Sequence, residues 1–143
     1  RQRQMCKETG LHLCHVFTVD DLKYLHRGGR VSKTAAIAGS ILGIKPLLHV
    51  DNEGHLIPVG KIRGRKQSIE KLVDMMCERM GNWDNSTVAV CHGDCLSDAE
   101  YAADLMRKKL GKKTTVHICY TGAVIGSHSG PGTLALFFMG DQR

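Results

Sequence analysis

The chain has 143 residues, the usual size of one domain, and its 42% hydrophobic and 24% charged residues are typical of a globular protein. A second large domain, disorder and fibrous repeats are therefore excluded for this chain. The net charge of +6 is concentrated in residues 1–50 and 101–143, which indicates an anionic partner without identifying it. Aromatic residues make up 5%, too few for a broad base-stacking surface.

Location and processing are predicted from missing signals. No charge-free stretch has the pattern of a membrane span, and no signal peptide opens the chain, which starts at Arg1 without Met. We therefore expect a piece of a longer, cytoplasmic protein. In that compartment the six cysteines are expected to be free thiols.

The first fifty residues predict a strand, a short helix and an apolar segment. Residues 13–19 are rich in branched and aromatic side chains, as strands are, and Asp20 is the expected N-cap of a helix that Gly28 and Gly29 end. Residues 34–42 carry no charge, so as a helix they would have no solvated face. We expect this segment to be buried or to wall a cavity.

The middle of the chain predicts a hairpin and an amphipathic helix. Residues 44–50 and 56–62 flank the turn-forming sequence Asp-Asn-Glu-Gly, which is typical of a β-hairpin. From Ser68 onward apolar residues recur at helical spacing until Gly81. Residues 88–91 then predict a short buried strand.

The last third predicts one more helix and two more strands. Residues 97–100 match a capping box that opens a helix, and Gly111 ends it. Strands are expected at 114–119 and 134–138, with a Gly-rich loop over 122–132 between them. Strands alternating with helices, plus the hairpin, predict an α/β fold: two layers, with a mixed sheet of about six strands packed by helices.

The most unusual segment, residues 122–132, places four glycines and a proline around His128. Such backbone freedom suits a loop whose amides approach a ligand closely, and a tight turn with a surface histidine is the alternative. The segment is not a P-loop, because no Gly-Lys-Ser/Thr follows, and it lacks the glycine order of a dinucleotide-binding fingerprint.

Basic residues form three clusters. Arg27 is explained by the end of a helix, whereas Arg30, beyond the glycines, is a candidate to bind a carboxylate or phosphate. Four cations over 61–66 precede a helix N-terminus, which indicates either an acidic partner or protective charges on an edge strand. The cluster over 107–113 lies at a predicted helix C-terminus, where cations are favourable.

Cysteine and histidine, the ligands that zinc prefers, occur in 91–95 and 12–15, but at the wrong spacing for a zinc site. We expect these cysteines to be core thiols and expect no metal. Ser127 and Ser129 flank His128, but neighbours on one loop rarely present a nucleophile and its base to each other. No catalytic residue is therefore predicted.

Four motifs together resemble the DegV family: FTVDDLKYLHRGGRV from Phe17, IKPLL from Ile44, KIRGRK from Lys61 and IGSHSGPG from Ile125. Proteins of this family bind fatty acids, and some are the binding subunit of bacterial fatty acid kinase. The resemblance implies that residues 1–143 form one carboxy-terminal, acyl-chain-holding domain. The family's amino-terminal α/β domain would then be absent from this chain.

The resemblance also implies a ligand site. Arg30 and His128 would approach the fatty-acid carboxylate, and Ile37, Ile41 and Leu42 would help to line an apolar tunnel. A separate ATP-binding kinase subunit would phosphorylate the presented carboxylate. The chain itself would then be no enzyme and would need no cofactor besides its bound fatty acid.

Two other interpretations stay open. A small basic nucleic-acid-binding domain would use 27–30 and 61–66, although the few aromatic residues count against it, and we expect no nucleic-acid partner. In a protein-interaction module, Arg63, Arg65 and Lys66 would dock on an acidic surface of the kinase subunit. This second interpretation is compatible with fatty-acid binding.

Overall fold

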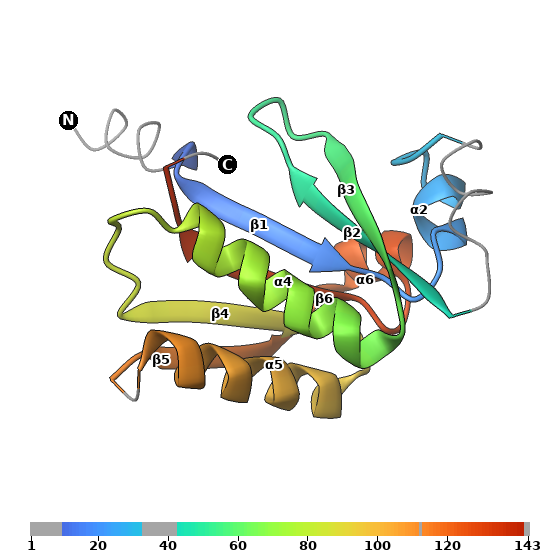
Figure 1. The fold of residues 1–143 in the computed structure, drawn as a ribbon. Helices are drawn as coiled ribbons and strands as arrows, with labels where there is room; N and C mark the ends of the chain where they lie inside the picture. The colour runs from blue at the N-terminus through green and yellow to red at the C-terminus, as the bar shows by residue number, and fades with distance from the viewer. Residues whose placement is uncertain (1–9, 33–42, 112, 142–143) are drawn as a thin grey trace.

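The computed structural model describes residues 10–32, 43–111 and 113–141 (Figure 1). The strands are β1 (Leu13–Thr18), β2 (Ile44–Val50), β3 (Leu56–Arg63), β4 (Thr87–His92), β5 (Thr115–Tyr120) and β6 (Leu134–Met139). The helices within these described ranges are α2 (Lys23–Arg27), α4 (Arg65–Arg79), α5 (Leu96–Leu110) and α6 (Ala123–Ser129).

All six strands belong to one sheet, in the order β3-β2-β1-β6-β4-β5. Neighbouring strands are antiparallel except for β4 and β5, which are parallel and are connected through α5. The β2–β3 hairpin is the one that the turn-forming sequence predicts. The predicted α/β class with a mixed six-stranded sheet is confirmed.

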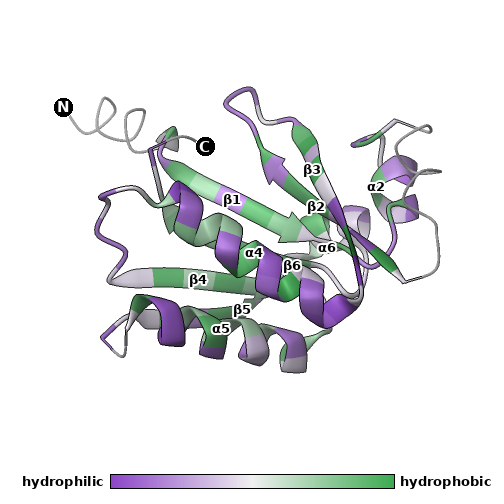
Figure 2. Ribbon diagram, in the orientation of Figure 1, coloured by the Kyte–Doolittle hydropathy of each residue, from purple (hydrophilic) through white to green (hydrophobic). Residues whose placement is uncertain are grey.

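Helices α4 and α5 lie together on one face of the sheet (Figure 1). Their apolar sides bury Leu72, Met76 and Met106 against strand residues such as Val90 and Leu136. Figure 2 shows hydrophilic residues along the outer sides of these helices and hydrophobic residues along β1 and β4. This layer is the main core, and it follows from the helical spacing of apolar residues.

A second apolar cluster lies at the other face of the sheet, next to α2. Its buried members come from β1, β2 and the start of the α2 segment: Phe17, Val19, Leu22, Leu25 and Leu48. Val31, the residue after Arg30, is partly buried against this cluster. Helix α2 also packs against α6. The two segments expected to carry the ligand-binding side chains are thus neighbours, although a hundred residues separate them in the sequence.

Both predicted helix caps are wrong. Helix α2 begins two residues later than an Asp20 cap requires, and the Asp20 carboxylate instead accepts a hydrogen bond from Lys45 Nζ at 2.7 Å. Helix α5 has Cys95 at its N-cap position, so residues 97–100 already lie inside it. The Cys95 amide donates to Nδ1 of His92 at 3.3 Å. At the start of α2 the amide of Lys23 donates to the side chain of Asp21 at 2.9 Å instead.

The prediction of a Gly-rich loop over 122–132 is also wrong in part, because α6 occupies most of this segment. Gly122 is at the N-cap, and Gly130, with φ of 79°, ends the helix. The amide of Gly126 donates to the Gly122 carbonyl and that of Gly130 to the Gly126 carbonyl, both at 2.8 Å. The outer glycines thus mark the ends of a short helix.

The charge-free segment 34–42, which the sequence predicts as a buried or cavity-lining helix, lies outside the described residues. In the parts of the chain that are described, no helix combines the length and the apolar character needed to cross a membrane.

Candidate functional site

The site is built where α6 meets the end of α2. Gly28 has an ordinary helical φ of −78°, so its backbone does not require glycine. A Cβ at this position, however, would overlap the His128 ring, 3.1 Å from Cγ and closer still to Nδ1. His128 lies in the last turn of α6 and is half-buried. Glycine is therefore needed at position 28 because the imidazole lies directly against the backbone.

Arg30 reaches the same glycine. Its amide donates to the Leu25 carbonyl at 2.8 Å, and one guanidinium nitrogen donates to the Gly28 carbonyl at 2.8 Å. Gly28 thus contacts both Arg30 and His128, the two residues that the resemblance to the family implies for the carboxylate. Within the described ranges, Arg30 has no carboxylate partner and neither ring nitrogen of His128 has a hydrogen-bond partner.

Each of these two side chains offers donors suited to an anionic oxygen. The guanidinium offers several fixed N–H donors, and the imidazole can add one more from its ring. Charge-assisted hydrogen bonds of this kind are short and stronger than neutral ones. The geometry therefore suits a carboxylate or a phosphate held beside Gly28.

The segment after α6 is held tightly against the residues around α2. Gly130 and Gly132 both have φ near 80°, and a Cβ at these positions would overlap the Tyr24 ring and the Asp20 side chain respectively. The Gly132 amide also donates to the Gly93 carbonyl at 2.7 Å. These contacts leave little freedom for the helix end that carries the imidazole.

The predicted docking residues have different environments. Arg63 and Lys66 are exposed. Arg65 is 19% exposed, and its Nε donates to the Asp98 carboxylate at 2.8 Å while another guanidinium nitrogen lies 3.7 Å from Asp20. Arg65 therefore connects α4 to α5 and to the residues before α2, an internal role that the sequence did not indicate.

A pocket of about 350 Å³ lies between the N-terminal ends of α4 and α5. It is lined by Arg65, Lys66, Ile69, Asp98 and Tyr101. Lys66 Nζ is 5.2 Å from the centre of the Tyr101 ring. The pocket is lined by two of the predicted docking residues, Arg65 and Lys66, and not by Arg30 or His128.

Three apolar side chains are exposed beside α6, a feature that the sequence analysis missed. Tyr120 is 70% exposed, Val124 73% and Ile125 60%. The last two lie on the same short helix as His128. Exposed apolar side chains on the helix that carries His128 are a feature found in binding regions. The signal in the sequence was a run of apolar residues inside a segment otherwise rich in glycine.

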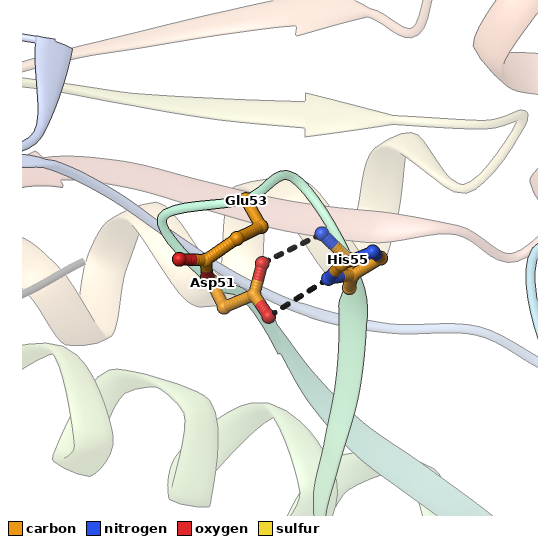
Figure 3. A group of neighbouring side chains, drawn as sticks. All are labelled: Asp51, Glu53 and His55. Carbon is orange, nitrogen blue, oxygen red and sulfur yellow. Dashed lines mark hydrogen bonds and ion pairs between the residues drawn. The ribbon is translucent and has the colours of Figure 1, made fainter.

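The turn between β2 and β3 gathers a second group of polar side chains, Asp51, Glu53 and His55 (Figure 3). The Asp51 carboxylate accepts hydrogen bonds from the His55 amide at 2.7 Å and from its ring Nδ1 at 3.2 Å. Slight desolvation raises the pKa of Asp51, but these hydrogen bonds outweigh it and lower that pKa below its ordinary value. The group serves to close the hairpin turn.

His49, near the end of β2, is a histidine of another kind. Burial, followed by the nearby positive charge of Arg79, lowers its pKa. Its buried Nδ1 has no hydrogen-bond partner among the described residues. His49 is thus a structural histidine that favours the neutral ring.

The cysteines only partly match the prediction of core thiols. Cys14 is fully buried, as predicted, whereas Cys91 and Cys95 are half-buried. Cys119, which the zinc argument did not consider, is exposed on β5. The three predicted tunnel residues, Ile37, Ile41 and Leu42, lie outside the described residues.

Comparison with known proteins identifies the family. A family model described as "Uncharacterised protein, DegV family" matches residues 3–141. A DegV domain-containing protein of Clostridium perfringens is 48% identical over 131 residues, which is 92% of this chain and 45% of that protein. The chain belongs to the DegV family.

Solved structures agree with the fold. The crystal structure of a fatty acid binding DegV family protein from Streptococcus agalactiae superposes with a TM-score of 0.84 at 28% identity, covering 98% of this chain and 49% of that one. The Streptococcus pneumoniae fatty acid kinase B3 protein, loaded with linoleic acid, gives a TM-score of 0.86 at 16% identity, covering 97% and 48%. The chain thus spans about half the length of the relatives it matches.

Proposed function

We propose that this chain is the part of a fatty-acid-binding protein that holds the acyl chain and contributes Arg30 and His128 to the carboxylate. The observation that carries the proposal is the meeting of these two side chains at Gly28, each with donors unused within the described residues. The DegV protein of Streptococcus agalactiae supports it, because that relative is described as fatty acid binding.

The energetics suit an alkyl ligand whose head group is oriented by the protein. At about 0.8 kcal/mol per buried methylene, roughly 14 methylenes contribute on the order of 11 kcal/mol. The loss of translational and conformational freedom on binding costs about 4–15 kcal/mol, which offsets much of this gain. A carboxylate buried without donors would be costly, and the guanidinium and imidazole remove that cost.

The proposal assigns the acyl chain to apolar residues of this chain. Ile37, Ile41 and Leu42 would line the tunnel, and the exposed side chains beside α6 would be covered by the ligand or by the rest of a longer protein. Because the relatives are about twice as long, we propose that a further domain completes the head-group site.

We further propose that this protein is not itself an enzyme but a cytoplasmic presenting subunit. A separate ATP-binding kinase subunit would phosphorylate the carboxylate to an acyl phosphate. The fatty acid kinase B3 protein of Streptococcus pneumoniae, which shares this fold, supports the proposal. Arg63 at the end of β3 and Lys66 in the first turn of α4, both exposed, would contact an acidic surface of that subunit, with Arg65 fixing the start of α4.

The direct test is to extract the purified protein with organic solvent, identify fatty acids by mass spectrometry and titrate oleate or palmitate into the delipidated protein. We expect co-purified fatty acid or saturable binding. If the protein shows neither co-purified fatty acid nor saturable binding, the proposal is refuted. Binding should hardly respond to salt, whereas a steep loss between two salt concentrations would instead indicate a nucleic-acid-binding surface.

Two variants test the head-group site. Arg30→Ala and His128→Ala should impair acyl-phosphate formation more than fatty-acid retention, because the alkyl chain supplies most of the affinity. Arg27→Ala and His117→Ala are matched controls: both residues are charged or titratable and exposed, but Arg27 precedes Gly28 and His117 lies on β5. Equal loss of retention and phosphorylation in the first pair, or the same loss in the controls, would contradict the assigned roles.

A further inference from the structure

Two thiols lie opposite each other at the edge of the sheet. Cys91 of β4 and Cys119 of β5 are register partners in the parallel pair, and their Sγ atoms are 2.7 Å apart. The flanking residues Val90 and His92 are buried on the side of the helices. Because side chains alternate along a strand, the two thiols lie on the opposite face of the sheet.

The positions of the backbones permit a bond between these thiols. Neighbouring strands lie about 4.7–4.9 Å apart, within the roughly 4.4–6.8 Å between Cα atoms that disulfides span. The strand β5 is at the edge of the sheet, and Cys119 is exposed, so an oxidant in solution can reach its sulfur. The two Sγ atoms, 2.7 Å apart, have to approach by only about 0.7 Å to reach the length of a disulfide bond.

We propose that Cys91 and Cys119 are a redox-sensitive pair, which a hydroperoxide oxidises to an intrachain disulfide and a dithiol reduces again. No property of the fatty-acid site enters this inference. The pair would be a modification site on the face of the sheet away from α4 and α5.

The oxidation proceeds in two balanced steps. The exposed sulfur of Cys119 attacks the peroxide oxygen, the O–O bond breaks, and the thiol proton leaves with the other oxygen as water, giving a sulfenic acid. The sulfur of Cys91 then attacks the sulfenic sulfur, the S–O bond breaks, and the Cys91 proton leaves with the hydroxyl as water. Two thiols and one hydrogen peroxide thus give one disulfide and two waters, with two electrons passed to the peroxide.

The order of these steps follows from the surroundings of Cys91. Burial, and then the neighbouring thiol of Cys119, raise the pKa of Cys91 to about 12. Cys91 is therefore protonated near neutral pH and is also half-buried, so the exposed Cys119 is the thiol that meets the peroxide first. The rate of the second step should rise with pH, because the thiolate is the attacking form.

The disulfide would fix the part of the sheet that leads into α6. The residue after Cys119, Tyr120, packs its ring on His92 with centroids 4.4 Å apart, and the Thr121 amide donates to the His92 carbonyl at 2.8 Å. Helix α6 begins directly afterwards. Oxidation should therefore slow hydrogen exchange of the β5 amides, which lie on an edge strand.

The test is to treat the reduced protein with hydrogen peroxide and count thiols after unfolding. The chain has six cysteines, so the count should fall from six to four, and dithiothreitol should restore it. Trypsin should then release the peptides 80–107 and 114–143 as one disulfide-linked species from the oxidised protein. This mapping needs no variant, so it stays decisive even if a substitution disturbs folding.

Matched variants identify the partners. Cys91→Ser and Cys119→Ser should each abolish the loss of two thiols and the linked peptides, whereas Cys77→Ser and Cys95→Ser should keep both. The Cys95→Ser result matters most, because that residue shares a tryptic peptide with Cys91. Linked peptides that persist in Cys119→Ser, or a disulfide that joins two chains on a non-reducing gel, would overturn the proposal.

Discussion

The contact between Gly28 and the His128 ring gives the sharpest test of the ligand site. In Gly28→Ala the new methyl group would overlap the imidazole, so the ring has to move by about 1 Å to regain an ordinary contact. The backbone itself accepts alanine, because φ at this position is −78°. The substitution therefore displaces one functional side chain without straining the chain.

The expected magnitudes follow from this geometry. The free energy of unfolding should change by less than about 1 kcal/mol, because the His128 ring is half-buried and can swing outward. A hydrogen bond lengthened by about 1 Å is effectively lost. Losing one bond to a charged group costs about 1.5–3 kcal/mol, so the affinity for oleate should fall about 10- to 150-fold, a smaller loss than the one expected for acyl-phosphate formation.

Calorimetric titration of oleate, with urea unfolding of the same samples, measures both effects. Gly29→Ala is the matched control: its φ is +71° but no atom lies within 4 Å of the built Cβ. It should lower stability by about 1–2 kcal/mol and leave affinity unchanged. In Gly28→Ala/His128→Ala the two effects should not add, since both remove the same bond. Unchanged affinity in Gly28→Ala, or full additivity, would refute the reasoning.

Three further predictions concern stability, each measured by urea unfolding. Gly130→Ala should lower the free energy of unfolding by about 2 kcal/mol or more, because φ is positive there and the new methyl group would overlap the Tyr24 ring. Gly111→Ala is the control, because its φ is also positive but the space around it is open, and it should lower the free energy of unfolding by about 1–2 kcal/mol. Because burial lowers the pKa of His49, the stabilising contribution of its neutral ring is present above pH about 6.5 and is lost as the pH falls below it. In His49→Leu the free energy of unfolding should therefore decline less steeply between pH 7 and 5. An unchanged slope would contradict this. Arg65→Ala should cost about 1–2 kcal/mol through its ion pairs and Lys66→Ala less than about 0.5 kcal/mol, and equal losses would argue against the internal role of Arg65.

The sequence predicts well those elements whose apolar residues repeat regularly. Strands and the two long helices follow from such patterns, and the β2–β3 turn from its own residues. It fails where tertiary contacts decide. The Asp20 carboxylate forms an ion pair with Lys45, 25 residues further along the chain, instead of capping a helix. Local rules cannot anticipate partners that the fold brings from elsewhere.

The sequence names candidate residues for the site but does not predict their geometry. The motifs single out Arg30 and His128, yet no local pattern indicates that both contact Gly28, because α2 and α6 become neighbours only through the fold. The pairing of Cys91 with Cys119 likewise depends on β4 and β5 being adjacent and in register. Strand order is the information that the sequence lacked.

The glycines around His128 act differently from what a ligand-cradling loop requires. The amides of Gly126, Gly130 and Gly132 all donate to carbonyls within the chain, so they are not available to a ligand. The absent side chains instead let backbone and rings approach closely, which holds the end of α6 in place. In our proposal an anion at this site would therefore be bound through the side chains of Arg30 and His128. It follows that substituting these two side chains should remove head-group recognition, whereas glycine substitutions act by moving them.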